Sequence, residues 1–171
     1  SGSASYGIGG IVGQLNGTGS VKNCVNKAKV SGSTNVGGIV GYANGSSYEK
    51  IISGCVNLGK VSGGNSVGGI VGQFSGKGSV SDCYDRGDIA ASVSKAGGIV
   101  GYLYSTSSSY KNSVSNCYST GAVAAGSDAA AVVGKINNKS YSSVTNCYYL
   151  EGLAADSSAS AVSSDGLKGL A

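Results

Sequence analysis

A short phrase of glycine and aliphatic residues recurs along the chain about every 30 residues. GGIVG occurs at residues 9–13, 37–41, 68–72 and 97–101, and a looser version, AAVVG, occurs at 130–134. Between successive copies stands one cysteine, with an aliphatic residue three positions before it and another six positions after it. Self-similarity of this period is typical of solenoid and array proteins, in which each unit packs only against its neighbours.

The cysteines align the repeats, and the alignment locates the predicted strands. Each unit holds three strand-like runs: one around the cysteine, one around the aliphatic residue six positions later, and one at GGIVG. Glycine and asparagine residues between the runs supply turns. A helix would not tolerate this much glycine, which costs about 1 kcal/mol per residue relative to alanine. We therefore expect an all-β fold, a parallel β-solenoid resembling a right-handed β-helix, with about five coils of roughly 30 residues.

The repeat pattern also predicts how the chain is divided. We expect the solenoid to occupy residues 1–153 and a C-terminal cap to occupy residues 154–171. The cap would contain a short helical turn at 166–170, with Leu167 and Leu170 covering the last coil, because an open solenoid end invites edge pairing. No comparable segment precedes the first repeat. This predicts an uncapped N-terminal end, neighbouring domains in a longer chain, and end-to-end self-association.

One connection in each repeat varies in length. The segment between GGIVG and the aliphatic residue before the cysteine has 7, 10, 7, 12 and 9 residues in successive repeats. Repeat proteins place such insertions on one edge, which is often the binding edge. The tyrosines of these segments can present flat rings to a sugar or to a protein partner, although a wet surface also tolerates tyrosine. The candidate ligand-binding residues are Tyr48, Tyr102, Tyr104, Tyr110, Tyr141 and Lys111.

The cysteines and the residues after them predict stacked columns inside and outside the solenoid. Because free cysteine behaves as a small buried hydrophobe, the five cysteines predict an inward column of reduced thiols. A disulfide between neighbouring coils is the alternative. Tyr84, Tyr118 and Tyr148 each follow a cysteine, and they predict a structural stack on one face.

Composition narrows the classes of function. The chain has no histidine, so it has no Ser-His-Asp triad and no histidine-based metal site. The net charge of +4 is scattered and does not alternate with aromatic residues, which argues against a nucleic-acid partner. No apolar stretch approaches the length of roughly 18 residues needed to span a membrane. We therefore expect no enzyme activity, no cofactor, no bound metal and no membrane insertion.

One acidic cluster offers an alternative. Asp82, Asp85 and Asp88 lie close together in sequence. Paired carboxylates can cleave polysaccharides by acid–base chemistry, and carboxylate oxygens suit calcium. The simpler interpretation is that these are turn residues beside Cys83, where other repeats have asparagine.

The repeated phrases resemble a known family. Gly10-Ile11-Val12-Gly13 and its later copies, together with Asn-Cys-Tyr, resemble the GLUG-motif repeats of bacterial secreted and surface proteins. Isoleucine stands where the family name has leucine, and in the fifth copy Ala131 replaces the first glycine of the motif. The resemblance implies an extracellular or cell-surface repeat region without catalytic residues.

The resemblance and the composition together give a functional hypothesis. We expect a structural and interaction module that acts as an adhesin stalk or binding domain for a host glycan or protein. The alternatives are a polysaccharide-acting enzyme that uses the acidic cluster, and a passive spacer beside a surface protease domain.

Overall fold

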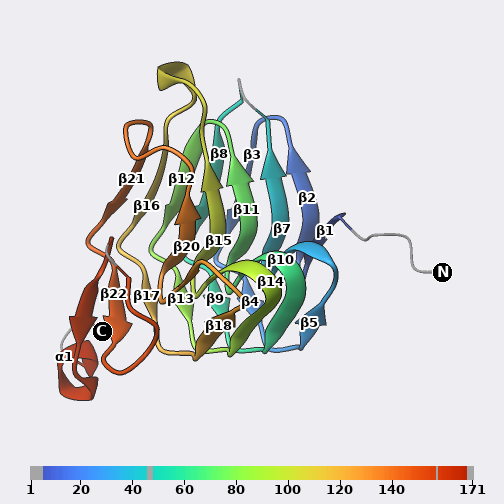
Figure 1. The fold of residues 1–171 in the computed structure, drawn as a ribbon. Helices are drawn as coiled ribbons and strands as arrows, with labels where there is room; N and C mark the ends of the chain where they lie inside the picture. The colour runs from blue at the N-terminus through green and yellow to red at the C-terminus, as the bar shows by residue number, and fades with distance from the viewer. Residues whose placement is uncertain (1–5, 46–47, 157, 169–171) are drawn as a thin grey trace.

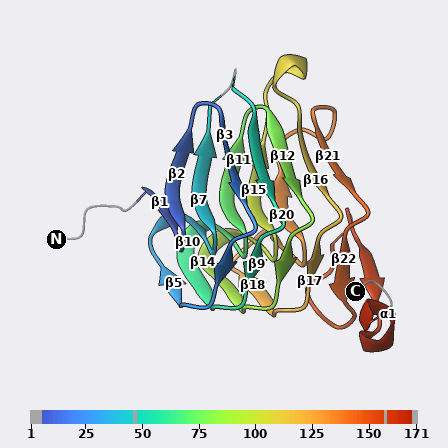
Figure 2. The same cartoon turned by 180° about the vertical axis from the view of Figure 1, so that it is seen from behind.

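The computed structural model describes residues 6–45, 48–156 and 158–168. The chain forms a β-solenoid of about five coils whose strands pair in parallel with the equivalent strands of the next coil. Figures 1 and 2 show the coils side by side, running from the N-terminal coil at one end to the C-terminal coil at the other. The predicted fold class is confirmed.

Four sheets make the four sides of the solenoid, and each coil contributes to all of them. Sheet A contains β1 (Tyr6–Gly9), β6 (Thr34–Gly37), β10 (Val61–Gly68), β14 (Ile89–Gly97) and β18 (Val123–Ala125), with β5 (Val30–Ser31) and β19 (Ala129–Ala130) at its margins. Sheet B contains β2 (Val12–Asn16), β7 (Val40–Asn44), β11 (Val71–Ser75), β15 (Val100–Tyr104) and β20 (Val133–Ile136). Sheet C contains β3 (Gly19–Lys22), β8 (Lys50–Ser53), β12 (Gly78–Ser81), β16 (Asn112–Ser115) and β21 (Ser142–Thr145). Sheet D contains β4 (Val25–Asn26), β9 (Val56–Asn57), β13 (Tyr84–Asp85), β17 (Tyr118–Ser119), β22 (Tyr148–Leu150) and β23 (Ser160–Val162).

The described part of the chain also contains two short helices. The 3-10 helix η1 (Ser108–Tyr110) lies in the connection between β15 and β16, and α1 (Ser164–Lys168) follows β23. The predicted helical turn is present but begins earlier than expected, because the hydroxyl of Ser163 accepts a hydrogen bond from the Gly166 amide at 3.2 Å. The Leu167 side chain and Leu170, which were expected to cover the last coil, lie outside the described residues.

The prediction of three strands per coil is wrong, because two of the sequence signals mark corners. GGIVG is divided between two strands: its first glycine ends a sheet A strand and its valine begins a sheet B strand. Each cysteine lies between a sheet C strand and a sheet D strand. The residue before each cysteine has a left-handed backbone, as in Asn23 (φ 54°) and Gly54 (φ 63°). Asparagine, aspartate and glycine tolerate this conformation, which explains the recurring Asn-Cys pair.

The interior is a thin core of aliphatic side chains and thiols. Equivalent valines and isoleucines of successive coils pack together with Phe74 and Leu103 in the larger of two buried clusters. Four cysteines are buried, Cys24 of the first coil is half-buried, and all five are free thiols. The inward direction predicted for the cysteine column is therefore confirmed.

The second glycine of GGIVG packs against polar side chains of sheet D. A Cβ atom added to Gly38 would lie 2.5 Å from Cγ of Asn57, and one added to Gly69 would lie 2.4 Å from Cγ of Asp85. Such distances leave no room for a larger residue. The glycine repeat is therefore required by the close approach of two sides of the coil.

Candidate functional site

The variable connections between sheets B and C all lie on one edge of the solenoid, as expected from their length variation (Figure 1). The connections after β2 and β11 are short, and those after β7, β15 and β20 are longer. The short connection of the third coil therefore lies between two longer ones.

One inward position supports two of the three longer connections, whereas at the third the Ser142 hydroxyl is buried without a hydrogen-bond partner. The first residue of each sheet C strand occupies the same register position in every coil. Where the connection is short this residue is glycine, and where it is long the residue carries a polar side chain. In chain order the five residues are Gly19, Lys50, Gly78, Asn112 and Ser142.

Lys50 supports the connection between β7 and β8. Its side chain is fully buried, and Nζ donates hydrogen bonds to the carbonyl oxygens of Gly45 at 2.5 Å and Tyr48 at 2.8 Å. Burial lowers the pKa of the Lys50 ammonium group. The lysine thus donates hydrogen bonds to two carbonyl oxygens of the connection, which lie outside the strands.

Two side chains hold the connection between β15 and β16. Asn112 Nδ2 donates to the carbonyl oxygen of Tyr104 at 2.9 Å, and the Ser105 hydroxyl donates to that of Tyr110 at 2.9 Å. The Ser107 hydroxyl accepts a hydrogen bond from the Ser109 amide at 3.2 Å and so caps η1. These contacts fix the long connection as a wall on one side of the third coil.

A cavity of about 190 Å³ lies over the third coil, between strand β7 on one side and strand β15 with the connection after it on the other. We call it the notch. Its lining comes from the strands β7, β11 and β15 and from the residues after them. It is lined by Tyr42, Asn44, Gln73, Ser75, Gly76, Tyr104, Ser105, Thr106 and Tyr110.

The register of sheet B places the aromatic walls of the notch. Tyr42 of the second coil and Tyr102 of the fourth coil both pair with Gln73 of the third. Tyr104 likewise pairs with Ser75. Since neighbouring strands lie about 4.8 Å apart, the two aromatic walls are separated by the width of one coil that carries only small or amide side chains.

The notch offers aromatic rings and unused amide atoms but no charge. The Tyr42 hydroxyl donates to Asn44 Oδ1 at 3.1 Å, and Gln73 Nε2 donates to the Ser75 hydroxyl at 2.9 Å. These contacts leave Asn44 Nδ2 as a donor and Gln73 Oε1 as an acceptor for a ligand. The lining contains no aspartate, glutamate, lysine or arginine. The chemistry suits an uncharged ligand rich in hydroxyl groups.

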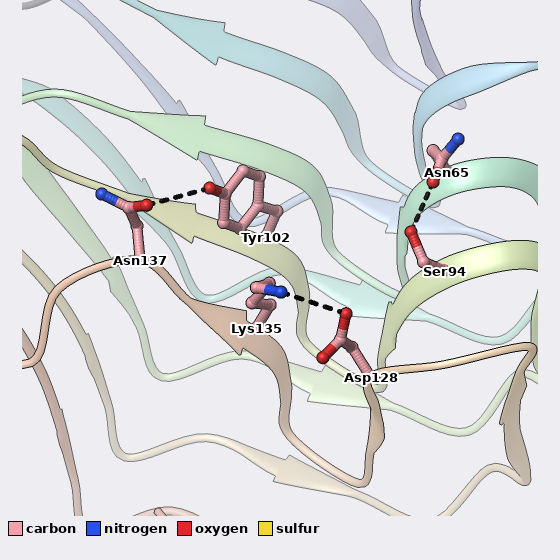
Figure 3. Close-up of polar contacts among 6 residues, drawn as sticks. All are labelled: Asn65, Ser94, Tyr102, Asp128, Lys135 and Asn137. Carbon is pink, nitrogen blue, oxygen red and sulfur yellow. Dashed lines mark hydrogen bonds and ion pairs between the residues drawn. The ribbon is translucent and has the colours of Figure 1, made fainter.

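Tyr102 lies beside the notch and is held by the fourth and fifth coils. Figure 3 shows its hydroxyl pointing toward Asn137, with an oxygen-to-oxygen distance of 3.2 Å. Lys95 Nζ lies 5.0 Å from the ring centroid, and the Tyr104 ring lies 5.6 Å away. Burial, with a contribution from Tyr104, raises the pKa of Tyr102, so the hydroxyl stays protonated and donates.

The same view shows two further contacts, one between Lys135 of sheet B and Asp128 in the turn before β19, and one within sheet A. Lys135 and Asp128 form an ion pair at 3.3 Å, and the Ser94 hydroxyl donates to Asn65 Oδ1 (Figure 3). Both partners of the ion pair are partly exposed, so its contribution to stability is small. The polar groups of these four side chains therefore already bond one another.

The structure separates the predicted site residues into groups. Tyr104 and Tyr110 line the notch, and Tyr102 adjoins it. Tyr48 is exposed outside it, with 57% of its surface accessible. Contrary to the sequence-based interpretation, Tyr102 and Tyr104 lie on strand β15 rather than in a loop.

Lys111 and Tyr141 come together at a second hollow on the same edge. This cavity of about 230 Å³ lies between the fourth and fifth coils and is also lined by Lys139. It carries two amines and one aromatic ring, whereas the notch carries three rings and no amine. The two hollows therefore differ in the ligands they suit.

Of the notch residues, sequence reasoning placed only Tyr104 and Tyr110 in the candidate set, so it left out Tyr42, Asn44 and Gln73. The signal that locates them is the period of two along a strand. Counted from the last glycine of GGIVG, the first and third following residues point outward, because side chains alternate across a sheet. Extending the sheet B strand by this rule identifies Tyr42 and Gln73 as neighbours and places Tyr104 beside Ser75, one outward position further along.

The three aspartates of the acidic cluster do not gather at one site in the structure. Asp85 is fully buried, whereas Asp82 and Asp88 are exposed. Asp82 Oδ1 accepts a hydrogen bond from Asn116 Nδ2 at 3.1 Å and belongs to a surface row of turn residues. Within the part of the chain that the structure describes, no group of three acidic or cysteine side chains lies close enough to hold a metal ion.

The tyrosines after the cysteines form a partial stack on sheet D. The rings of Tyr84 and Tyr118 lie 4.0 Å apart at an interplanar angle of 18°. Tyr148 is the next register partner, and it lines a cavity with Tyr118, Asn116 and Asn146. The predicted stack is therefore confirmed for the first pair.

Comparison with known proteins gives one match. No curated protein and no solved structure matches the chain. Among the described residues, no helix has the length and apolar character needed to cross a membrane. The family model of the GLUG motif matches residues 4–31, which correspond to the first coil as far as β5. The first coil of this solenoid therefore carries a GLUG motif, as the resemblance of its repeated phrase predicted.

Proposed function

We propose that this β-solenoid is a non-enzymatic binding module of a bacterial cell-surface or secreted protein, and that its notch binds a glycan. The observation that carries the proposal is the notch itself, with three tyrosine rings and two amide side chains around an uncharged cavity. The GLUG motif of the first coil supports a repeat module. A stack of similar coils gives the notch a rigid support, as an adhesin stalk requires.

The chemistry of the notch favours a sugar over a charged ligand. Tyrosine rings present an apolar surface that packs on the apolar face of a pyranose ring, with a hydroxyl at the edge. Asn44 Nδ2 and Gln73 Oε1 can each bond a sugar hydroxyl. The volume of about 190 Å³ is smaller than that of pockets that enclose drug-sized ligands. The notch therefore suits one sugar ring within a longer glycan.

A binding screen with matched variants tests the proposal. The purified protein is applied to an array of bacterial and host glycans, and the ligands found are titrated by calorimetry. Tyr104→Ala and Tyr42→Ala each remove one aromatic wall, and we expect each to weaken binding about tenfold, which corresponds to ~1.4 kcal/mol.

Two variants outside the notch serve as controls. Tyr48→Ala and Tyr141→Ala remove tyrosines from the same edge but not from the notch. We expect both to bind like the wild type. Loss of binding in these controls but not in Tyr104→Ala would place the ligand elsewhere. Absence of any glycan ligand would refute glycan binding and favour the passive spacer.

A further inference from the structure

A row of buried polar side chains runs through the interior behind sheet D. Two residues after the cysteine, successive coils carry Asn26, Asn57, Asp85 and Ser119 in register. Asn26 Nδ2 donates to Asn57 Oδ1 at 2.8 Å, and Asn57 Nδ2 donates to Asp85 Oδ1 at 2.7 Å. The hydrogen bonds all run in one direction, from each coil toward the next.

Each asparagine in the row also forms hydrogen bonds with the backbone of its own coil. Asn57 Nδ2 also donates to the carbonyl oxygen of Gly59 at 2.8 Å, and its Oδ1 accepts from the Gly59 amide at 3.3 Å. Asn26 makes the same two contacts with Ala28, at 2.9 and 3.1 Å. The carboxamide therefore uses both its donor group and its acceptor oxygen.

Asp85 reproduces only the acceptor half of this arrangement. Its Oδ1 accepts from Asn57 Nδ2 and from the Gly87 amide at 3.3 Å. Its Oδ2 stands where an asparagine would have the donor nitrogen, and this oxygen is buried without a hydrogen-bond partner. The Ser119 hydroxyl, on the register partner of Asp85, is also buried without a partner.

Among the residues that the structure describes, no lysine or arginine forms an ion pair with Asp85. Asp85 is fully buried between Asn57, Ser119 and the backbone of Gly69. The charged residues of the adjoining turns are Lys60, Arg86 and Asp88, and all three are exposed. Burial raises the pKa of Asp85 to about 8, and Asp88 adds to the rise, while the contacts with the Asn57 amide group, the Gly87 backbone and the Ser119 hydroxyl oppose it.

We propose that Asp85 and Ser119 form a proton-binding site inside the third coil, in which the neutral carboxyl group continues the asparagine row. The proton resides on Oδ2 and is donated to the Ser119 hydroxyl. A protonated carboxyl group has one donor and one free acceptor oxygen, so it matches the role that the carboxamide has in the first two coils. The site goes beyond the proposed function, because it does not involve the notch.

The proposal fixes the sign of a pH effect. The folded protein keeps the proton up to about pH 8, whereas the unfolded chain releases it near its ordinary pKa of about 3.9. Folding therefore takes up a proton between these limits, and the stabilisation is complete below about pH 4. As pH rises to about 8, the ratio of folded to unfolded protein falls up to tenfold per pH unit through this group.

Two aspartate variants isolate the effect. Urea unfolding of the wild type, Asp85→Asn and Asp88→Asn is measured from about pH 4 to pH 8. Asp85→Asn restores the missing donor, and we expect its stability to exceed that of the wild type increasingly as pH rises. Asp88→Asn changes a nearby exposed carboxylate and should keep the wild-type slope. A difference between wild type and Asp85→Asn that does not depend on pH would overturn the proposal.

Infrared spectroscopy tests the site without relying on unfolding. At pH 7 the folded protein should show the carbonyl band of a protonated carboxylic acid that is absent from Asp85→Asn and present in Asp88→Asn. Absence of that band in the folded wild type would show that Asp85 is ionised. Glycan binding by Asp85→Asn should equal that of the wild type, so failure of the proton site and failure of the notch are told apart.

Discussion

The carboxylate of Asp156 takes the place of a further coil against the backbone of Val132. Along the solenoid, two consecutive amides at the corner between sheets A and B donate to one carbonyl oxygen of the next coil. For example, the Ile99 and Val100 amides donate to the carbonyl oxygen of Val132 at 2.9 and 3.0 Å. At the last coil, the Val132 and Val133 amides donate to Asp156 Oδ2 at 2.9 and 2.8 Å.

Removal of this carboxylate should destabilise the last coil. Asp156→Ala leaves two buried amides without an acceptor, and hydrogen bonds to charged groups contribute about 1.5–3 kcal/mol. We expect a loss of about 3 kcal/mol in the free energy of unfolding, measured by urea titration. Glu151→Ala, an exposed carboxylate nearby, should change it by no more than about 0.5 kcal/mol. Equal stability of the two variants would show that Asp156 does not cap the solenoid.

The glycines that face the asparagine row should resist even the smallest substitution. A Cβ atom on Gly69 would lie 2.1 Å from the carbonyl oxygen of Gly98 and 2.4 Å from Cγ of Asp85. Gly69→Ala must therefore push two coils apart, and we expect a loss of about 3 kcal/mol in the free energy of unfolding. Gly166→Ala, in helix α1 where a Cβ has ordinary contacts, should be neutral or stabilising. Thermal unfolding of both variants by circular dichroism compares them directly, and a stable Gly69→Ala protein would contradict the close approach.

The sequence predicts the fold well because the repeat brings equivalent residues of successive coils into the same register. The solenoid, the inward thiols and the single edge for variable connections all follow from spacing. The sequence misplaces Tyr104 because the length variation predicts a loop from the end of GGIVG, whereas the strand alternation continues past it. The role of Asp156 cannot be predicted from the sequence. It is a single carboxylate in an Ala/Ser-rich segment, and the groups that it bonds are backbone amides far away in sequence. Asp85 stands out in the sequence as part of an acidic cluster, but its burial does not follow from the sequence, because it depends on which face of sheet D turns inward.

Lys50 should control the connection that adjoins one wall of the notch. Lys50→Met keeps a long side chain but removes the donors to the carbonyl oxygens of Gly45 and Tyr48. We expect a loss of about 2 kcal/mol in the free energy of unfolding, because two carbonyl oxygens lose their hydrogen-bond donor. We also expect faster proteolysis within the connection between β7 and β8. Lys139→Met, on an exposed part of the same edge, is the matched control. Unchanged stability and proteolysis in Lys50→Met would show that this connection holds its shape without the lysine.

The thiols should react in the order set by their position in the column. Cys24 is half-buried in the first coil, whereas Cys55 and Cys117 are fully buried. Contacts with neighbouring thiols, together with burial, raise the pKa of both Cys55 and Cys117, so little reactive thiolate forms at neutral pH. A disulfide reagent should therefore label Cys24 first in the native protein and all five only in urea. Mass spectrometry of the peptides identifies the labelled residues, and Cys24→Ser should abolish the early phase. Early labelling of Cys117 would mean that the column opens in the folded protein.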